Sequence, residues 1–178
     1  AGILEEYFGG FGFETLYRPF DKNWGIGVEA WRVQQRDFNL DFRFRDYKTT
    51  TGYINFYLRE PRSKVFLVVT GGRFLAEDSG ILVDISRQFD SGVNVGVFAA
   101  ITDISKEEFG EGSFDKGFYF NLPVQLFFNK YSRGQTGFGL KPLTRDGAAK
   151  LYHGHSLWAV TNGASMFNVE KTWNSFYD

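Results

Sequence analysis

Carboxylates gather between positions 107 and 116, where they could perform acid–base chemistry on a sugar. Glu108, Glu111 and Asp115 lie close together there, beside Lys116. Hydrolysis of a glycosidic bond needs two carboxyl groups several ångströms apart across the sugar. The surrounding glycines are typical of a solvated loop, so we favour a loop that contacts ligand over a catalytic pair. We predict no catalytic residue and no enzymatic activity.

His153 and His155 are the only two histidines, and their spacing would place both on one side of a strand. They could supply two metal ligands, but a zinc site usually needs at least three from the protein. No further ligands are evident nearby, so we predict an ordinary polar pair, with no metal and no cofactor. The run Gly9-Gly10-Phe11-Gly12 lacks the following helix that a phosphate cradle requires.

Charged residues elsewhere could form a ladder inside a barrel and hydrogen-bond an acidic or hydroxyl-rich glycan. The residues of this ladder are Arg36, Arg43, Arg45, Asp46, Arg73, Asp84 and Arg87. The same residues also fit a structural salt-bridge network that plugs or stiffens a barrel, and we favour that interpretation. Together with the loop residues Glu108, Glu111, Asp115 and Lys116, they are the candidate glycan-contacting set.

The composition favours an all-β protein to position these residues. Phe 21, Tyr 9 and Trp 4 stand beside Gly 21 and only Pro 4 in 178 residues, with no cysteine. Aromatic side chains cover a pleated sheet well, and glycine permits the turns and bulges that a sheet needs. A net charge of −1 gives no field that would attract nucleic acid. We therefore expect one β-domain over residues 1–178 and no nucleic-acid partner.

Alternating apolar and polar side chains recur along the chain and predict antiparallel strands. In the second of them, Trp24, Ile26 and Val28 oppose Gly25, Gly27 and Glu29. The predicted strands are 10–18, 24–32, 47–59, 65–73, 81–88, 93–101, 118–124 and 135–141. The polar segment 34–46 is expected to be a long loop or strand ends that project into water, and a second polar loop is expected at 103–117. Beyond Pro142 the pattern weakens, so 142–178 is expected to be less regular, with 156–161 as one more short strand.

The connections between these strands alternate between short turns and longer polar loops, as in an up-and-down outer-membrane barrel. Tyr17, Phe20, Trp24 and Phe89 cluster near the short turns, where aromatic rings would meet a membrane interface. Mean hydropathy is −0.28, which suits strands that show lipid only alternate side chains. A soluble barrel with its aliphatic residues inward would share the alternation. Glycines and charges on the other face favour a wet lumen.

Several motifs also resemble one family of envelope proteins. They are Phe44-Arg45-Asp46-Tyr47, Thr51-Gly52-Tyr53, the run 72–80 (GRFLAEDSG), the run 84–93 (DISRQFDSGV), the run 107–117 (EEFGEGSFDKG) and the run 143–148 (LTRDGA). These resemble the YjbH/GfcD family of outer-membrane proteins from exopolysaccharide and group 4 capsule systems. The likeness covers roughly the whole chain and matches the C-terminal portion of longer members.

The resemblance implies a location in the outer membrane of a Gram-negative bacterium and a role in exopolysaccharide or capsule export or assembly. The implied partners are membrane lipid or lipopolysaccharide, the polysaccharide, and other envelope proteins of the same system. We therefore predict a non-enzymatic, antiparallel up-and-down transmembrane β-barrel of about eight or more strands, either by itself or as part of a larger barrel protein. The alternative is a soluble or periplasmic β-barrel module that binds a glycan or lipid.

Overall fold

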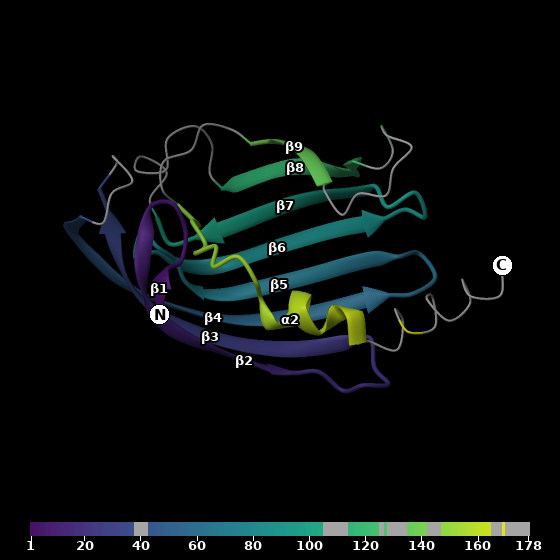
Figure 1. Cartoon of the computed structure of the whole chain (residues 1–178), viewed down its shortest axis with the longest axis horizontal. Helices are drawn as coiled ribbons and strands as arrows, with labels where there is room; N and C mark the ends of the chain where they lie inside the picture. The colour runs from purple at the N-terminus through teal and green to yellow at the C-terminus, as the bar shows by residue number, and fades with distance from the viewer. Residues whose placement is uncertain are drawn as a thin grey trace.

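The chain forms one long antiparallel sheet in which each strand pairs with the next along the sequence (Figure 1). The computed structural model describes residues 1–37, 43–104, 114–124, 127, 135–141, 147–164 and 169. Within them the sheet has nine strands in the order β1 to β9. The predicted all-β meander is therefore confirmed. The sheet is open, because β1 pairs only with β2, and β9 only with β8.

The strands differ widely in length. They are β1 (Gly2–Ile3), β2 (Phe8–Tyr17), β3 (Trp24–Arg36), β4 (Phe44–Glu60), β5 (Val65–Arg73), β6 (Ser79–Gln88), β7 (Asn94–Thr102), β8 (Asp115–Pro123) and β9 (Gln135–Leu140). The predicted strands correspond to β2 through β9, and β5 has the predicted bounds. β1 was not expected from the sequence.

In the described part of 34–46, residues 34–36 and 44–46 belong to strands, which agrees with the expected strand ends; residues 38–42 lie outside the described residues. β3 continues to Arg36 and β4 begins at Phe44, with an irregular register between Gln34 and Arg36. The backbone ladder extends past the apolar alternation there, and Arg36 is buried with its side chain bonded to the carbonyl of Glu6. In the same way, Asp115 to Gly117 lie in β8, not in the preceding loop.

The expected strand at 156–161 is a helix instead. α2 (Leu157–Thr161) begins after Ser156, whose side-chain oxygen accepts a hydrogen bond from the Ala159 amide. A serine in this position satisfies an amide that the first helical turn leaves free, and this local bond favours helix over strand. A short 3₁₀ turn, η2 (Asn162–Ala164), follows.

The two faces of the sheet differ in chemistry. One face carries Glu14, Glu29 and Tyr53, which are partners across neighbouring strands, and Thr70, which pairs with Asn55 two residues along from Tyr53. The C-terminal segment lies over this face (Figure 1). We call this the strap face, and residues 147–164 the strap. The opposite face, called the outer face, carries side chains such as Ile54, which is 60% exposed.

The hydrophobic core lies between the sheet and the strap. Trp31, Val33 and Tyr53 from the strap face pack with Phe74 and Leu75 of the β5–β6 connection, and with Leu151 of the strap. Aromatic rings therefore fill the space between the sheet and the strap, which forms no strand. No helix in the described part of the chain is long and apolar enough to cross a membrane.

Candidate functional site on the strap face

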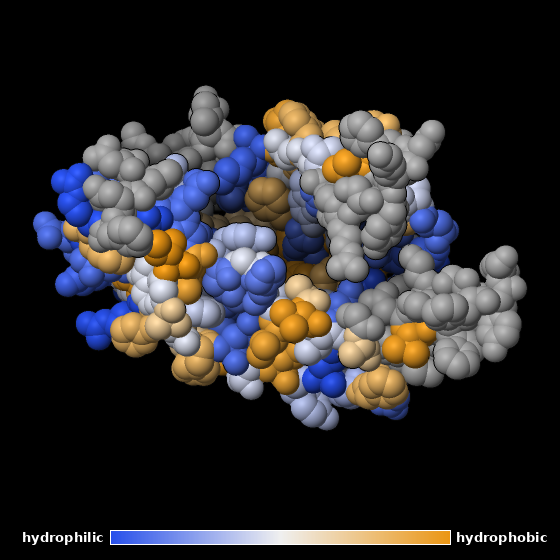
Figure 2. All heavy atoms as spheres, viewed as in Figure 1, coloured by the Kyte–Doolittle hydropathy of each residue, from blue (hydrophilic) through white to orange (hydrophobic). Residues whose placement is uncertain are grey.

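The strap crosses the strap face over β2 to β5, with α2 in front of the strands (Figure 1). The Leu75 amide donates to the carbonyl of Ala149 at 3.0 Å, and the Ala148 amide donates to the buried carboxylate of Asp78 at 2.7 Å. Beside the strap the surface is hollowed, and the recess holds both polar and apolar residues (Figure 2). The strap therefore fills only part of this face.

Glu29 is the centre of the polar contacts beneath the strap. Its carboxylate is 2% exposed and accepts hydrogen bonds from Trp31 Nε1 at 2.9 Å and Asn55 Nδ2 at 2.8 Å. Lys150 Nζ lies 3.1 Å from one oxygen, and His153 Nε2 lies 3.1 Å from the other. A buried carboxylate is tolerated when its lone pairs are filled and a cation is close. Two of the four groups that meet Glu29 belong to the strap.

Asn55 extends this network to the next strand. Its side-chain oxygen accepts hydrogen bonds from Thr70 Oγ1 at 2.7 Å and from Lys150 Nζ at 2.8 Å. The carbonyl oxygen and the amide of Asn55 thus both have partners although the residue is fully buried. The arrangement fixes the orientation of the amide and leaves Lys150 shared between β3 and β4.

Glu14 stands directly opposite Glu29 in the β2–β3 register, so two carboxylates face the strap side by side. His153 Nε2 lies between them, 4.0 Å from Glu14 and 3.1 Å from Glu29. The hydrogen bond to Glu29 raises the pKa of His153, and the charges of both carboxylates act in the same direction against burial and Lys150. The site therefore favours a protonated His153.

Aromatic rings lie flat against one another along the same contact. His153 stacks on Trp31 with ring centres 4.7 Å apart, and Trp158 of α2 stacks on Tyr57 at 4.6 Å. Phe66 lies 5.6 Å from Trp158 on the neighbouring strand. Such faces hold planar or apolar ring surfaces by dispersion and by their quadrupole. The part of the strap face formed by Glu14, Glu29, Trp31, Asn55 and Tyr57, which we call the wall, thus offers ring platforms beside carboxylate and amide groups.

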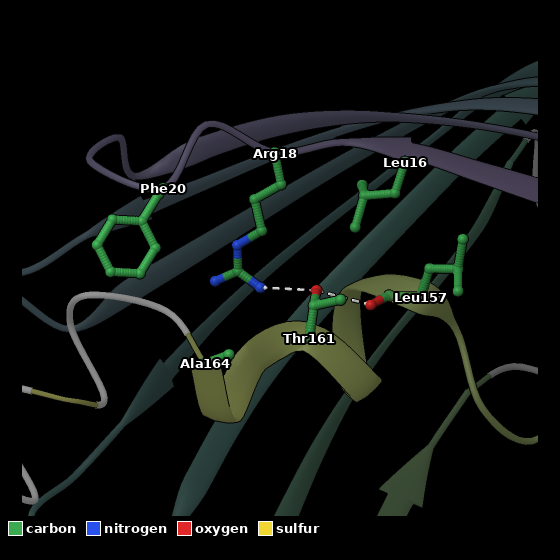
Figure 3. Close-up of a pocket in the computed structure, with 6 residues that line it drawn as sticks. All are labelled: Leu16, Arg18, Phe20, Leu157, Thr161 and Ala164. Carbon is green, nitrogen blue, oxygen red and sulfur yellow. Dashed lines mark hydrogen bonds between the residues drawn. The ribbon is translucent and has the colours of Figure 1, made fainter.

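Arg18 fastens the end of α2 and borders a small pocket of about 280 Å³ (Figure 3). Its guanidinium carbon lies 3.8 Å from the centre of the Trp158 ring, and its NH1 donates to Thr161 Oγ1 at 3.2 Å. At the other end of the helix, the Leu157 amide donates to the carboxylate of Glu14 at 3.0 Å. Opposite charges thus meet the helix ends in the sense that its dipole favours.

A larger cavity of about 680 Å³ opens where the strap joins the β5–β6 connection. Tyr7, Phe8 and Tyr47 line it together with Gln35 and Ala149, and Tyr47 Oη donates to the carbonyl of Leu75 at 2.6 Å. Its aromatic lining and its size suit one or two sugar rings, and it lies at the end of the wall next to the Glu29 network.

The predicted charged ladder is not assembled, which corrects that expectation. Arg73 and Arg87 point to the outer face, where Arg73 pairs with Glu77 at 3.0 Å and Arg87 lies over the ring of Phe89. Asp84 lies on the strap face and accepts a hydrogen bond from Tyr119 at 2.9 Å. Alternate positions of a strand face opposite ways, and the odd-numbered Arg73 and Arg87 therefore face away from the even-numbered Asp84.

The remaining candidates are spread over both ends of the sheet. Arg36 is buried and donates to the carbonyl of Glu6 at 2.9 Å, Arg43 lies 3.8 Å from Asp37, and Arg45 and Asp46 are exposed at the start of β4. Asp115 is 5% exposed in β8, and Lys116 turns to the other side and lies over the ring of Phe114. Glu108 and Glu111 lie outside the described residues.

Sequence reasoning missed Glu14, Glu29, Asn55 and Lys150. A signal was present, because Glu14 and Glu29 are carboxylates on the glycine-bearing faces of two adjacent predicted strands. The predicted turn at 19–23 would pair Arg18 with Trp24 and set Glu14 opposite Val28, one residue away from the observed pair of Glu14 with Glu29. The strap's contacts with β2 to β5 had no such signal, since they join residues far apart in the sequence, for example 95 positions for Lys150 with Asn55 and 124 for His153 with Glu29.

These features define a class: a long antiparallel meander whose polar wall bears carboxylates, amides and aromatic platforms suited to holding a ligand. Within the described residues, no group of three or more histidine and acidic side chains is placed to hold a metal. The chain belongs to the YjbH family, whose model, described as exopolysaccharide biosynthesis protein YbjH, matches residues 1–163.

A relative from Escherichia coli (strain K12), described as uncharacterized lipoprotein YjbH, is 42% identical over 170 residues. The match covers 93% of this chain and 24% of the relative, so the chain spans about a quarter of that protein's length. No solved structure matches. The predicted family resemblance is thus confirmed, and with it the link to exopolysaccharide biosynthesis.

Proposed function

We propose that this chain forms part of the wall of an outer-membrane β-barrel that serves exopolysaccharide export or assembly without catalysing a reaction. The observation that carries the proposal is the outer face of the sheet. Its exposed apolar side chains come from β2, β3, β4, β6, β7, β8 and β9: Phe11, Phe13, Tyr17, Ile26, Val28, Ile54, Phe56, Leu58, Ile81, Ile85, Val95, Val97, Ile101, Phe118, Phe138 and Leu140.

An apolar surface of this extent needs a cover. Val97 is 52% exposed and Ile101 is 66% exposed, although their neighbours on the same face are also aliphatic or aromatic. Soluble proteins rarely leave such a continuous patch open to water. Lipid covers it naturally, since outer-membrane strands alternate apolar residues toward lipid with polar residues toward the lumen.

The strand lengths and the aromatic residues agree with a membrane setting. β5 to β8 have 9 or 10 residues each, and a tilted membrane strand needs about 9 to 11. Tyr17, Phe20 and Phe89 are all exposed next to the short turns. Rings in such positions form the aromatic girdles at the two membrane interfaces.

The opposite arrangement, a soluble barrel with its aliphatic side chains inside, does not agree with these faces. Glu29 and Asn55 are buried under the strap, whereas Ile54, which precedes Asn55 on β4, is exposed on the outer face. The polar face is therefore the covered one. The strap face is the side that we assign to the lumen and to contact with polysaccharide.

The relative's description as a lipoprotein supports a location in the bacterial envelope for this chain as well. Because the sheet is open and the relative is about four times longer than the matched segment, we propose that strands from elsewhere in a longer protein complete the barrel. The proposed partners are membrane lipid or lipopolysaccharide, the polysaccharide, and other envelope proteins of the same system.

Charge substitutions on β7 test the proposal. Val95→Asp or Val97→Asp places a carboxylate on the outer face, whereas Asn94→Asp places one on the strap face of the same strand. We expect the first two variants to be lost from the outer-membrane fraction and the third to assemble normally, because a charged side chain that faces lipid is destabilising, by about 2 to 4 kcal/mol at mid-depth for arginine or lysine and by less for aspartate. Equal assembly of all three would exclude a lipid-facing outer face.

A further inference from the structure

Two carboxylates face each other beneath the strap. Glu14 and Glu29 are cross-strand partners in β2 and β3, and their side chains are 8% and 2% exposed. Like charges directly opposite on a sheet repel, and burial strengthens the repulsion. This stretch of wall therefore requires a positive charge above it.

Both cations that meet this pair belong to the strap. His153 Nε2 lies 3.1 Å from Glu29 and 4.0 Å from Glu14, and Lys150 Nζ lies 3.1 Å from the other oxygen of Glu29. The sheet thus supplies the anions and the strap supplies the counter-charges. A wall that is complete only when an outside group brings positive charge has the character of a binding site.

The contacts around the carboxylates match what a sugar ring needs. Trp31 and Tyr57 present flat ring faces, which His153 and Trp158 of the strap now cover. The apolar C–H face of a pyranose stacks on such a ring, while its hydroxyls bond to groups like the Glu29 carboxylate and the Asn55 amide. Each group of the wall that would recognise a sugar is occupied by a strap side chain.

The strap can leave without breaking the sheet. Across the ranges that the structure describes, the strap bonds to the side chains of the strands and not to their backbone. Lys150 meets the carboxylate of Glu29, and the Leu151 amide donates to Tyr53 Oη at 3.2 Å. The helix within it has five residues, and Tyr152 and Val160 are 71% and 64% exposed. The strap's buried side chains are Ala148, Leu151 and Trp158, and because the strap belongs to no strand ladder it opens at lower free energy than the strands below it.

We propose that the wall formed by Glu14, Glu29, Trp31, Asn55 and Tyr57 is a binding track for an amine-bearing glycan, and that the strap occupies it as an internal substitute for that ligand. A neutral or acidic glycan that displaced the strap would leave both carboxylates without a cation. A protonated amino sugar would bring the positive charge that Lys150 and His153 supply beside Glu14 and Glu29. This inference rests on the proposed contact with polysaccharide, but it does not depend on the membrane location.

The test measures binding of chitotriose, which carries free amines, and of its fully N-acetylated form to the detergent-solubilised protein by titration calorimetry. We expect chitotriose to bind and the acetylated form to bind at least about tenfold more weakly. Glu29→Gln, which keeps the side-chain shape, should weaken chitotriose binding by about tenfold. Equal binding of both sugars, or of neither, would overturn the proposal.

Two further variants separate displacement from simple loss of structure. Lys150→Ala loosens the strap and leaves the wall intact, so chitotriose should bind it more tightly than it binds the unmodified protein. Leu16→Cys with Leu157→Cys places two thiols on the same small pocket of a chain that has no cysteine. A short bis-maleimide that joins them should abolish binding, and the single-headed N-ethylmaleimide should not.

Binding that persists in the tethered variant, or that falls in Lys150→Ala, would contradict displacement of the strap. These outcomes are independent of membrane assembly, which the charge substitutions on β7 measure. If the glycan-binding experiment contradicts the track, the proposal of a lipid-facing outer face still stands. If the charge substitutions contradict that outer face, the glycan-binding proposal is unaffected.

Discussion

Glu29 is held by four donors at 2.8 to 3.1 Å, and two of them come from a segment over 120 positions away. The carboxylate therefore links the end of the chain to β3. A residue in this position contributes to stability through the groups that it satisfies as well as through its own burial. Removal of Glu29 leaves Lys150 and the amide of Asn55 without their main partner.

Glu29→Ala is expected to lower the free energy of unfolding by about 3 to 5 kcal/mol, the usual cost of breaking a buried ion pair from one side. Chemical denaturation of the detergent-solubilised protein measures the change. Glu77→Ala is the control, because its pair with Arg73 is about half exposed on both sides and such pairs contribute about 0 to 1 kcal/mol. Similar losses in the two variants would contradict the role given to Glu29.

His153 makes docking of the strap depend on pH. Its pKa is raised above the ordinary 6.5, first by the hydrogen bond to Glu29, with Glu14 of β2 acting in the same direction and Lys150 of the strap against it. A raised pKa in the docked state means that the stabilisation is complete below pH 6.5 and is lost as the pH rises through the raised value.

We therefore expect amide hydrogen exchange in residues 150–160, corrected for its intrinsic pH dependence, to show weaker protection at high pH than at low pH. Amides in β5 serve as an internal control, since they belong to the sheet ladder. In His153→Gln the difference between low and high pH should be much smaller. Protection of the strap that rises with pH would rule out this function of His153.

At the scale of elements, the strands could be predicted from sequence and the strap could not. Alternation in Trp24 to Arg32 places Ile26 and Val28 against Gly25 and Gly27, and the structure has the same two faces. Where the side chains stop alternating, at Gln34 to Arg36 and at Phe44 to Asp46, the backbone ladder continues to the pair of Arg36 with Phe44, and the side-chain pattern does not predict this. Register, not composition, decides which charges meet.

The 156–161 segment shows why a short apolar run misleads. Leu157, Trp158 and Val160 suit a strand by propensity, but the Ser156 cap and the contacts of Trp158 with Tyr57 and Arg18 hold a helical turn. Propensity is a weak guide when tertiary contacts decide. The candidate site was likewise missed because it depends on pairs far apart in sequence.

Close packing between strands gives a prediction at this scale. Gly96 of β7 faces Tyr119 of β8, and a methyl group on Gly96 would lie 2.4 Å from the ring. Gly96→Ala should displace the ring, break its hydrogen bond to Asp84 and cost about 1 to 3 kcal/mol. Thermal or chemical unfolding measures the loss.

Gly139→Ala is the matched control for Gly96→Ala. Gly139 of β9 pairs with the same Tyr119 from the other side, but the added methyl would lie 3.6 Å from the nearest atom, an ordinary contact. It should change stability little. A loss in Gly139→Ala as large as that in Gly96→Ala would show that the packing around Tyr119 is not what limits substitution.

At the scale of the whole molecule, the sheet separates two environments. The outer face presents aliphatic and aromatic side chains from β2 to β9, and the strap face presents carboxylates, amides and stacked rings. The alternation in the sequence predicted both surfaces but could not say which one is covered. The strap resolves this, because it buries Glu29 and Asn55 and leaves Ile54 exposed.

Labelling of single cysteines in intact membranes tests the lipid-facing outer face most directly, because the chain has no cysteine of its own. Ile54→Cys and Val97→Cys lie on the outer face, and Ser91→Cys lies in an exposed turn. A membrane-impermeant, water-soluble maleimide should label Ser91→Cys when it is added on the side of the membrane where that turn lies. Added on the other side, it should label Ser91→Cys only after the membrane is permeabilised. The two outer-face cysteines should resist it in both cases, because a thiol in apolar surroundings stays protonated, and should react with it once the protein is unfolded in sodium dodecyl sulfate. Rapid labelling of Ile54→Cys and Val97→Cys by the water-soluble reagent would contradict the account.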